Sequence, residues 1–215
     1  MNSLFFDLDG TLLNTQAGIA ESILAALTQL GHPEASPTSL QSCFGPPIRD
    51  SFSRLLESDN AALIEQAVSL FREHYLQQGI YNYQIYPGIE KLLHQLANSA
   101  IPLRVLTIKP QPQAQWLLDH AALAPLFQSI HGSELDGSRS DKSLHLLSLL
   151  QQSQSPEDKH WMIGDRANDI SAAKACGIHS VAVTWGYGEL AELSDANSDF
   201  IIDSPHELIS LLETV

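Results

Sequence analysis

The sequence predicts an α/β protein with a doubly wound parallel sheet and an inserted helical domain. Two observations predict this fold class. Short apolar runs recur along most of the chain, and each is followed by a segment whose apolar residues have helical spacing. Between residues 15 and 86 the alternation stops, and only helical stripes remain. Strands that alternate with helices are typical of parallel sheets, because a crossover helix joins each strand to the next.

The expected strands are short and apolar, as in a sheet that helices cover on both faces. They are Leu4 to Thr11, which ends in carboxylates and a glycine, Leu103 to Thr107, His160 to Gly164, His179 to Thr184 and Phe200 to Ile202. The helices between and after them should each place apolar residues on one face. These sets are Ile89, Leu92, Leu93 and Leu96, then Leu144, Leu147 and Leu150, then Leu208, Leu211 and Leu212, which follow Pro205 at an expected first helical position.

The helical segment divides the chain into two expected domains. Residues 1–14 and 87–215 should form the sheet domain, and residues 15–86 an α-helical domain inserted after the first strand. The turn residues Tyr86, Pro87 and Gly88 mark the place where the chain can return to the sheet. A helical lid joined at the mouth of a sheet-end site can exclude water and choose substrates, so this placement favours an enzyme.

Composition excludes several functional classes. With 11 Lys and Arg against 25 Asp and Glu, the formal net charge is −14, and basic residues do not cluster, which argues against nucleic-acid binding. Apolar stretches stay far short of the roughly 20 residues that a membrane-crossing helix needs. The N-terminus lacks the pattern of a signal peptide. We therefore expect a cytoplasmic protein, a monomer or homodimer, that acts on a small molecule and binds neither nucleic acid nor membrane.

An acidic pair ends the first strand. Asp7 and Asp9 are two residues apart, so their side chains share a side of the strand or gather around one point where the strand ends. Two close carboxylates repel unless a cation neutralises them or one is protonated, and such pairs therefore mark metal and acid/base sites. Read alone, the pair is also compatible with a simple turn at Gly10.

A second acidic cluster, Asp165 and Asp169, follows the apolar run that ends at Gly164. The carboxyl ends of parallel strands lie at one edge of a sheet, so this cluster can approach Asp7 and Asp9 if the two strands are neighbours. Four carboxylates need a cation, and oxygen ligands without His or Cys select Mg²⁺ over Zn²⁺. Asp169 can also cap the helix that follows it.

Two further residues can bind phosphate. Thr107 ends an expected strand, and Lys142 begins an expected helix. A hydroxyl and an ammonium group both donate to phosphoryl oxygens. Taken singly, Thr107 is compatible with a core strand residue and Lys142 with a solvated lysine.

The order of these motifs resembles the haloacid dehalogenase-like hydrolase superfamily. It is an Asp-x-Asp-Gly-Thr motif, a strand-end Thr, a Lys and a Gly-Asp-x-x-x-Asp motif, here at residues 7–11, 107, 142 and 164–169. The segments 44–52 and 132–142 are similar to those of phosphoglycolate phosphatase-like and 5'-nucleotidase-like members. The resemblance implies a Rossmann-like core with a small α-helical cap, which is the inserted domain.

The resemblance also implies a Mg²⁺-dependent phosphatase that hydrolyses small phosphate monoesters, phosphoglycolate-like or nucleoside monophosphate-like. Asp7 would form an aspartyl phosphate, and Asp9 would protonate the departing alcohol and then deprotonate the attacking water. The metal would be held by Asp7, the backbone carbonyl of Asp9 and Asp165, with Asp169 orienting Lys142 or the metal's water ligands.

Thr107, Lys142 and the backbone of the loop at Gly10 would bind the phosphoryl oxygens. The alternatives are a phosphomutase with the same core, and, from a different class, a receiver-like signalling protein or a noncatalytic phosphate-binding protein. A receiver carries its acidic pair and its acceptor on different strands, whereas here Asp7 and Asp9 share one strand.

Substrate choice is expected in the inserted domain, because the core residues contact only the phosphoryl group. Arg49 follows two prolines that restrict the backbone, and it can reach a second anionic group of a substrate such as a carboxylate. It can equally pair with Asp50 or Glu57 at the surface. The loop from Trp185 to Gly188 can border the active site or simply close the fold.

Overall fold

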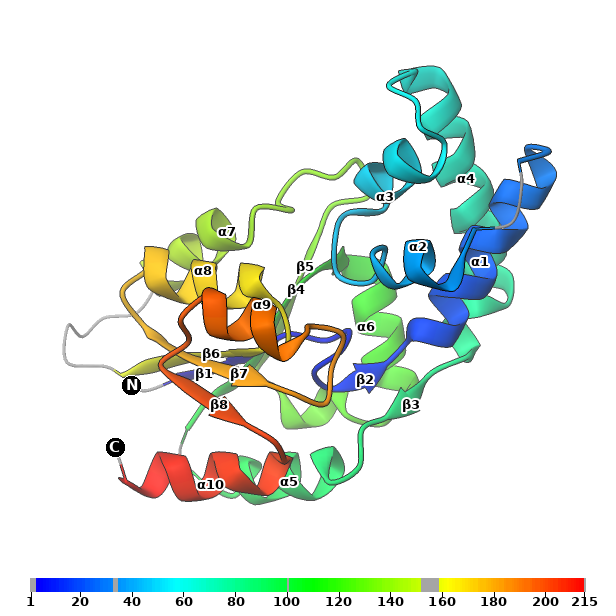
Figure 1. The fold of residues 1–215 in the computed structure, drawn as a ribbon. Coiled ribbons are helices and arrows are strands. Elements are labelled where there is room, and N and C mark those ends of the chain that lie inside the picture. Colours follow the sequence, from blue (N-terminus) through cyan, green and yellow to red (C-terminus); the bar gives the residue numbers. More distant parts are fainter. Residues whose placement is uncertain (1–2, 33–34, 100, 152–158, 215) are drawn as a thin grey trace. The chain divides into compact units, whose positions relative to one another are not determined.

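The computed structural model describes residues 3–32, 35–99, 101–151 and 159–214. Its contacts divide the chain into two compact units, one of Met1–Leu13 with Ile85–Val215 and one of Asn14–Gln84. Figure 1 labels the helices and strands of both units. None of the described helices combines the length and the apolar character that crossing a bilayer demands.

A parallel sheet with the strand order β5-β4-β1-β6-β7-β8 forms the centre of the first unit (Figure 1). Its strands are β1 (Ser3–Phe6), β4 (Leu103–Pro110), β5 (Ser129–Ser133), β6 (His160–Gly164), β7 (His179–Val183) and β8 (Phe200–Ile202). β1 lies between β4 and β6, and Phe6 pairs with Ile163. The carboxyl ends of β1 and β6 are therefore neighbours at one edge, and the predicted fold class is confirmed.

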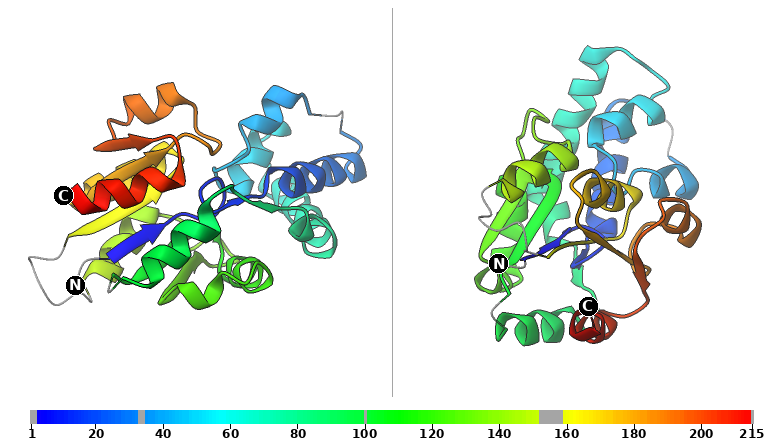
Figure 2. Two further views of the ribbon diagram at one scale, coloured as in Figure 1. Left: turned by 90° about the horizontal axis from the view of Figure 1, so that it is seen from below. Right: turned by 90° about the vertical axis from the view of Figure 1, so that its left-hand side faces the viewer.

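Helices cover both faces of this sheet, as the views in Figure 2 show together with Figure 1. One face carries α7 (Lys142–Leu150), α8 (Ala167–Ala175) and α9 (Leu190–Asp195), and the other carries α5 (Ile89–Ala97), α6 (Gln111–His120), η2 (Ala124–Leu126) and α10 (Pro205–Thr214). Under α7 and α8, side chains from three neighbouring strands form a buried core with the helices, made by Phe5, Leu106, Leu146, Met162, Ala172 and Ala173. This core fixes the strand ends that carry the acidic residues.

Three strands differ from the sequence-based expectation. β1 was expected to run from Leu4 to Thr11 but ends at Phe6, so Asp7 and Asp9 follow the strand. The sequence does not predict β5, because Ile130 is the one aliphatic residue of this edge strand, which pairs with β4 alone in the sheet order. β4 continues past Thr107 to Pro110, since its pairing with β5 shifts after Leu106 and resumes where Pro110 meets Ser133. Thr107 therefore lies within the strand and not at its end.

The helix α7 forms where expected but buries a different face. Leu144 is 66% and Leu147 is 43% exposed, whereas Leu146 is fully buried. The reason is Lys142, whose buried side chain reaches the acidic cluster. Residues four apart share a helix face, so burial of Lys142 turns Leu146 toward the sheet. The predicted apolar face with Leu144 and Leu147 is wrong.

The second unit is helical, with α1 (Gln16–Gln29), α2 (Pro37–Gln41), α3 (Ile48–Leu55), α4 (Ala61–Gln77) and η1 (Gly79–Tyr81). α4 packs against α1 and α3, and the rings of Phe52, Phe71 and Tyr75 form a buried aromatic row. The short strands β2 (Leu13–Asn14) and β3 (Gln84–Ile85) pair where the chain enters and leaves this unit. The contact-based unit spans Asn14–Gln84, and its role as an inserted cap domain over residues 15–86 is a proposal taken up below.

The contrast between Leu146 and Leu144 can be tested by truncation. Leu146→Ala should lower the free energy of unfolding by about 2 to 5 kcal/mol, because it opens a cavity in the core under α7. Leu144→Ala is the matched control and should change it by about 0.5 kcal/mol or less, as expected for an exposed position. Urea denaturation followed by circular dichroism measures both. Equal losses would contradict the observed face of the helix.

Candidate active site

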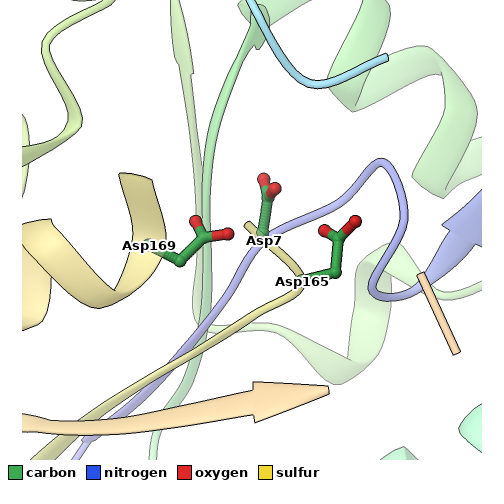
Figure 3. Close-up of side chains that lie close together, drawn as sticks. All are labelled: Asp7, Asp165 and Asp169. Atoms are coloured by element: carbon green, nitrogen blue, oxygen red, sulfur yellow. The ribbon is translucent and has the colours of Figure 1, made fainter. Parts of the chain in front are cut away.

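Three buried carboxylates meet at the carboxyl ends of β1 and β6 (Figure 3). Asp7 directly follows β1, Asp165 directly follows β6, and Asp169 lies in the first turn of α8. Each offers an oxygen atom, and these atoms lie within 4.8 Å of one another. The structure thus brings together three of the four carboxylates that the sequence analysis grouped.

Asp7 lies just after β1, and its backbone still bonds to the neighbouring strand β6. Its backbone N–H donates to the carbonyl of Ile163, 2.9 Å away, and the residue is only 7% exposed. Lys142 Nζ lies 3.1 Å from Asp7 Oδ1, and within the described chain no hydrogen bond reaches that buried oxygen. Burial raises the pKa of Asp7 to about 6, with Asp169 and Asp9 adding to the effect and Lys142 opposing it.

Both carboxylate oxygens of Asp165 accept hydrogen bonds. Thr11 Oγ1 donates to its Oδ1 at 3.1 Å, and the backbone N–H of Tyr187 donates to its Oδ2 at 2.8 Å. Burial, and then the charges of Asp7 and Asp169, raise the pKa of Asp165 well above its ordinary value. Its orientation is therefore fixed, although its negative charge is poorly compensated.

Asp169 connects the helix start to the lysine. Its Oδ2 accepts a hydrogen bond at 3.0 Å from the backbone N–H of Arg166, the residue before α8. Its Oδ1 lies 2.5 Å from Lys142 Nζ. Burial alone would lower the pKa of Lys142, but the charges of Asp169 and Asp7 raise it overall, so this lysine is a permanent cation. Asp169 thus both caps its helix and positions Lys142.

Asp9 is not one of the three clustered carboxylates, and its side chain contacts Lys109. Lys109 Nζ is 3.1 Å from Asp9 Oδ1 and 3.0 Å from Asp9 Oδ2, and the lysine is buried. The sequence analysis did not assign Lys109 to the site. The signal was present, because Lys109 is two residues beyond Thr107 in the same strand and so shares its side of the sheet.

Thr107 is buried, and its Oγ1 accepts a hydrogen bond from the Lys109 N–H at 3.2 Å. A hydroxyl that accepts one hydrogen bond can still donate another, so Thr107 retains the capacity to bind an oxygen of a ligand. Gly10 turns the chain after Asp9 with φ +87°, and a Cβ there would lie 2.1 Å from Asp165 Oδ2. Only glycine leaves that space to the carboxylate.

The loop after β7 also belongs to the site. Besides the Tyr187 contact, Trp185 Nε1 donates to the carbonyl of Thr11 at 3.0 Å, and a Cβ on Gly186 would lie 2.3 Å from Asp165 Cβ. The spacing of glycines around aromatic residues was the available signal, since it permits close approach of the backbone. Burial raises the pKa of Tyr86, and the charges of Asp165 and Asp9 add to this effect.

Arg49 lies in the helical unit, at the start of α3. Its Nε donates to Glu65 Oε1, and its Nη2 donates to Glu65 Oε2 at 3.1 Å. The partner is therefore neither Asp50 nor Glu57, which the sequence had suggested. A two-point pair of this kind is specific in geometry but, at an exposed position, weak in energy.

The acidic cluster fits a hard divalent cation. It supplies carboxylate oxygens without His or Cys, it is buried, and one of its oxygens has no hydrogen bond from the described residues. Mg²⁺ prefers such oxygen ligands, usually with few carboxylates and several waters. One lysine balances only part of the charge of Asp7, Asp165 and Asp169, so a cation would relieve the remaining repulsion.

Comparison with known proteins gives a family match over most of the chain. The family described as haloacid dehalogenase-like hydrolase matches residues 4–183. A 5'-nucleotidase of Pseudomonas aeruginosa is 35% identical over 89% of this chain and 86% of its own length. A phosphoglycolate phosphatase of Aliivibrio fischeri is 29% identical over 96% of this chain and 94% of its own.

One of the similar proteins is named a kinase and not a phosphatase. The tyrosine-protein kinase PtkA of Mycobacterium tuberculosis is 32% identical over 99% of this chain and 72% of its own length. Among solved structures, the crystal structure of a predicted phosphatase from Clostridium acetobutylicum matches with a TM-score of 0.91 and 32% identity. That match covers 100% of this chain and 99% of the other.

Cation binding at the acidic cluster can be tested through stability. Mg²⁺ should raise the melting temperature of the metal-free protein, because a ligand that binds the native state alone stabilises it. Asp165→Asn should weaken this response, whereas Asp119→Asn, at an exposed position on α6, should leave it unchanged. Differential scanning fluorimetry over a Mg²⁺ series, with excess chelator to reverse it, makes the measurement. An equal response in Asp165→Asn would rule out cation binding at this cluster.

Proposed function

From the premise that this chain belongs to the haloacid dehalogenase-like hydrolase family, we propose that it is a Mg²⁺-dependent phosphatase acting through a phosphorylated Asp7. The family match confirms the resemblance predicted from the sequence. With the phosphatase names among the relatives, it also confirms the enzyme class, a phosphoric monoester hydrolase. In our proposal the substrate is a small phosphate monoester, and residues 15–86 serve as the cap over the active site.

The proposal rests mainly on the surroundings of the Asp7 carboxylate. Its Oδ1 is buried, lies 3.1 Å from Lys142 Nζ and receives no hydrogen bond from the described residues. A carboxylate oxygen without a hydrogen bond keeps its lone pairs available, and the nearby ammonium group attracts an anionic phosphoryl group. Asp7 is therefore the proposed nucleophile.

Asp9 is the proposed general acid and base. It follows Asp7 by two residues, and both of its oxygens contact Lys109. In our proposal Asp9 protonates the departing alcohol and later takes a proton from the water that attacks the phosphorus. Lys109 would hold the Asp9 carboxylate in one orientation, which is a positioning role.

The remaining residues would bind the phosphoryl group. Lys142 supplies a buried positive charge, Thr107 a hydroxyl donor, and the backbone at Gly10 further N–H groups. Asp7, the backbone carbonyl of Asp9 and Asp165 would hold Mg²⁺, and Asp169 would orient Lys142 or the metal's water ligands. When bound, the cation would neutralise negative charge on the phosphoryl oxygens.

The candidate reactions differ in what accepts the phosphoryl group. A phosphatase transfers it to water, a phosphomutase to a sugar hydroxyl, and a kinase such as the one named above to a protein side chain. The residues around Asp7 contact the phosphoryl group in all three cases, so they do not separate these reactions. The release of free phosphate from a monoester in water does, and it is the experiment that tests the proposal.

The nucleophile assignment predicts a specific loss. Asp7→Asn should abolish release of phosphate from p-nitrophenyl phosphate, because an amide has nearly the same shape but is not nucleophilic. The melting temperature of the metal-free variant should stay at least as high as that of the wild type, since a poorly compensated buried charge is removed. Asp119→Asn is the matched control and should keep full activity. Turnover of Asp7→Asn close to that of the wild type would rule out Asp7 as the nucleophile.

A comparison of two substrates tests whether Arg49 recognises a carboxylate. If Arg49 leaves Glu65 to bind the carboxylate of phosphoglycolate, Arg49→Ala should raise KM for that ester and leave hydrolysis of p-nitrophenyl phosphate nearly unchanged. Arg54→Ala, on the same helix, is the matched control. Steady-state kinetics on both esters measure the difference. A uniform change, or none, would assign Arg49 to its surface pair with Glu65.

A further inference from the structure

The loop of residues 185–188 lies between β7 and α9 and packs against the acidic cluster within the first unit. Two of its positions approach Asp165 so closely that only glycine fits. A Cβ on Gly186 would lie 2.3 Å from Asp165 Cβ, and a Cβ on Gly188 would lie 2.0 Å from the backbone carbonyl oxygen of Asp165. A side chain at either position would therefore displace Asp165 or the loop.

Two hydrogen bonds hold the Asp165 carboxylate, and the loop takes part in both. The backbone N–H of Tyr187 donates directly to Oδ2 at 2.8 Å. The Thr11 hydroxyl donates to Oδ1 at 3.1 Å, and Trp185 Nε1 in turn donates to the Thr11 carbonyl at 3.0 Å. Thr11 and Asp165 are fully buried, so water does not compete for the bond between them. Trp185 therefore supports Asp165 through Thr11, whereas Tyr187 contacts it directly.

The helix α9, which begins just after this loop, binds the residues that follow Asp165. Glu192 Oε1 accepts hydrogen bonds from Arg166 Nε and from the backbone N–H of Ala167, each at 2.9 Å. Both charged side chains are partly exposed, so the attraction between their charges contributes little. The two bonds to one oxygen nevertheless fix the start of α8 against α9. The backbone just after Asp165 is thereby held as well as its side chain.

The Asp165 carboxylate needs such support because its neighbours repel it. Oxygen atoms of Asp7, Asp165 and Asp169 lie within 4.8 Å of one another. Like charges at this separation favour side-chain positions that point away from one another. A metal ligand that has turned away must be ordered again when the cation binds, and this ordering lowers the affinity. The hydrogen bonds and close packing around Asp165 oppose such a movement.

We propose that the loop of residues 185–188, together with Glu192, keeps the Asp165 carboxylate in its metal-binding position. Trp185 and Glu192 are then positioning residues that set the affinity for Mg²⁺. The inference rests on the proposed cation site, and it concerns residues of the first unit alone. It gives a role to a loop that, from the sequence alone, either borders the active site or simply closes the fold.

Isothermal titration calorimetry of Mg²⁺ into the metal-free protein, without any substrate, measures this affinity directly. Trp185→Phe keeps an aromatic ring but loses the N–H donor, and Thr11→Val keeps the shape but loses the hydroxyl. Each should weaken Mg²⁺ binding by about tenfold or more, the usual loss when a partner of a metal ligand is removed. Trp116→Phe, on α6, is the matched control and should bind Mg²⁺ as the wild type does.

The double variant tests whether Trp185 acts through Thr11. If it does, Thr11→Val combined with Trp185→Phe should lose less affinity than the product of the two single losses, because residues that share one network are not additive. Losses that multiply in full would overturn this route. Melting temperatures of the metal-free variants complete the test, since a merely structural role would lower them and leave the Mg²⁺ dissociation constant unchanged.

Glu192→Ala tests the same inference from α9, and it remains informative if Trp185→Phe does not fold. It should also weaken Mg²⁺ binding by about tenfold, whereas Glu189→Ala, at an exposed position just before α9, should not. Wild-type affinity in Trp185→Phe and Glu192→Ala, with weak binding in Asp165→Asn, would overturn the inference and leave the cation site in place. Wild-type affinity in Asp165→Asn as well would remove the cation site and, with it, the proposed Mg²⁺-dependent function.

Discussion

The structure around the active site depends on the negative charge buried at one edge of the parallel sheet, which neighbouring groups balance only in part. Asp7, Asp165 and Asp169 are buried, and their oxygens lie within 4.8 Å of one another. In a site that excludes water, such charges repel strongly, and Lys142 balances only part of them. Lys142 and Leu146 share the buried face of α7 while Leu144 faces solvent, so the face that packs on the sheet is also the one that brings the lysine to the carboxylates.

Glycines let the backbone pack closely against two of these carboxylates. A Cβ on Gly10 would lie 2.1 Å from Asp165 Oδ2, and one on Gly164 would lie 2.1 Å from Asp169 Cγ. At both places a larger residue would have to displace a carboxylate from the cluster. The glycines that stand beside the acidic motifs are therefore part of the site's geometry, because they let the chain close around the charged groups.

The sequence predicts the acidic site well because β1 and β6 are apolar runs that stop at Asp7 and Asp165, a pattern that depends on local residues alone. Their adjacency in the sheet is a long-range property, and only the structure supplies it. The same limit applies to the contact of Asp9 with Lys109: the position of Lys109 two residues after Thr107 places it near the site, but its pairing with Asp9 joins two strands and only the structure supplies it. Edge strand β5 was missed because a strand with one aliphatic residue gives almost no apolar signal.

The two units differ in the charge that each can apply to a substrate. The charged groups of the first unit surround Asp7, where they act on a phosphoryl group that every phosphate monoester shares. The second unit has a pocket beside α2 that is lined by uncharged side chains such as those of Gln41 and Tyr83, and the charge of Arg49 is balanced by Glu65. In our proposal, charge therefore serves the reaction common to all phosphate monoesters.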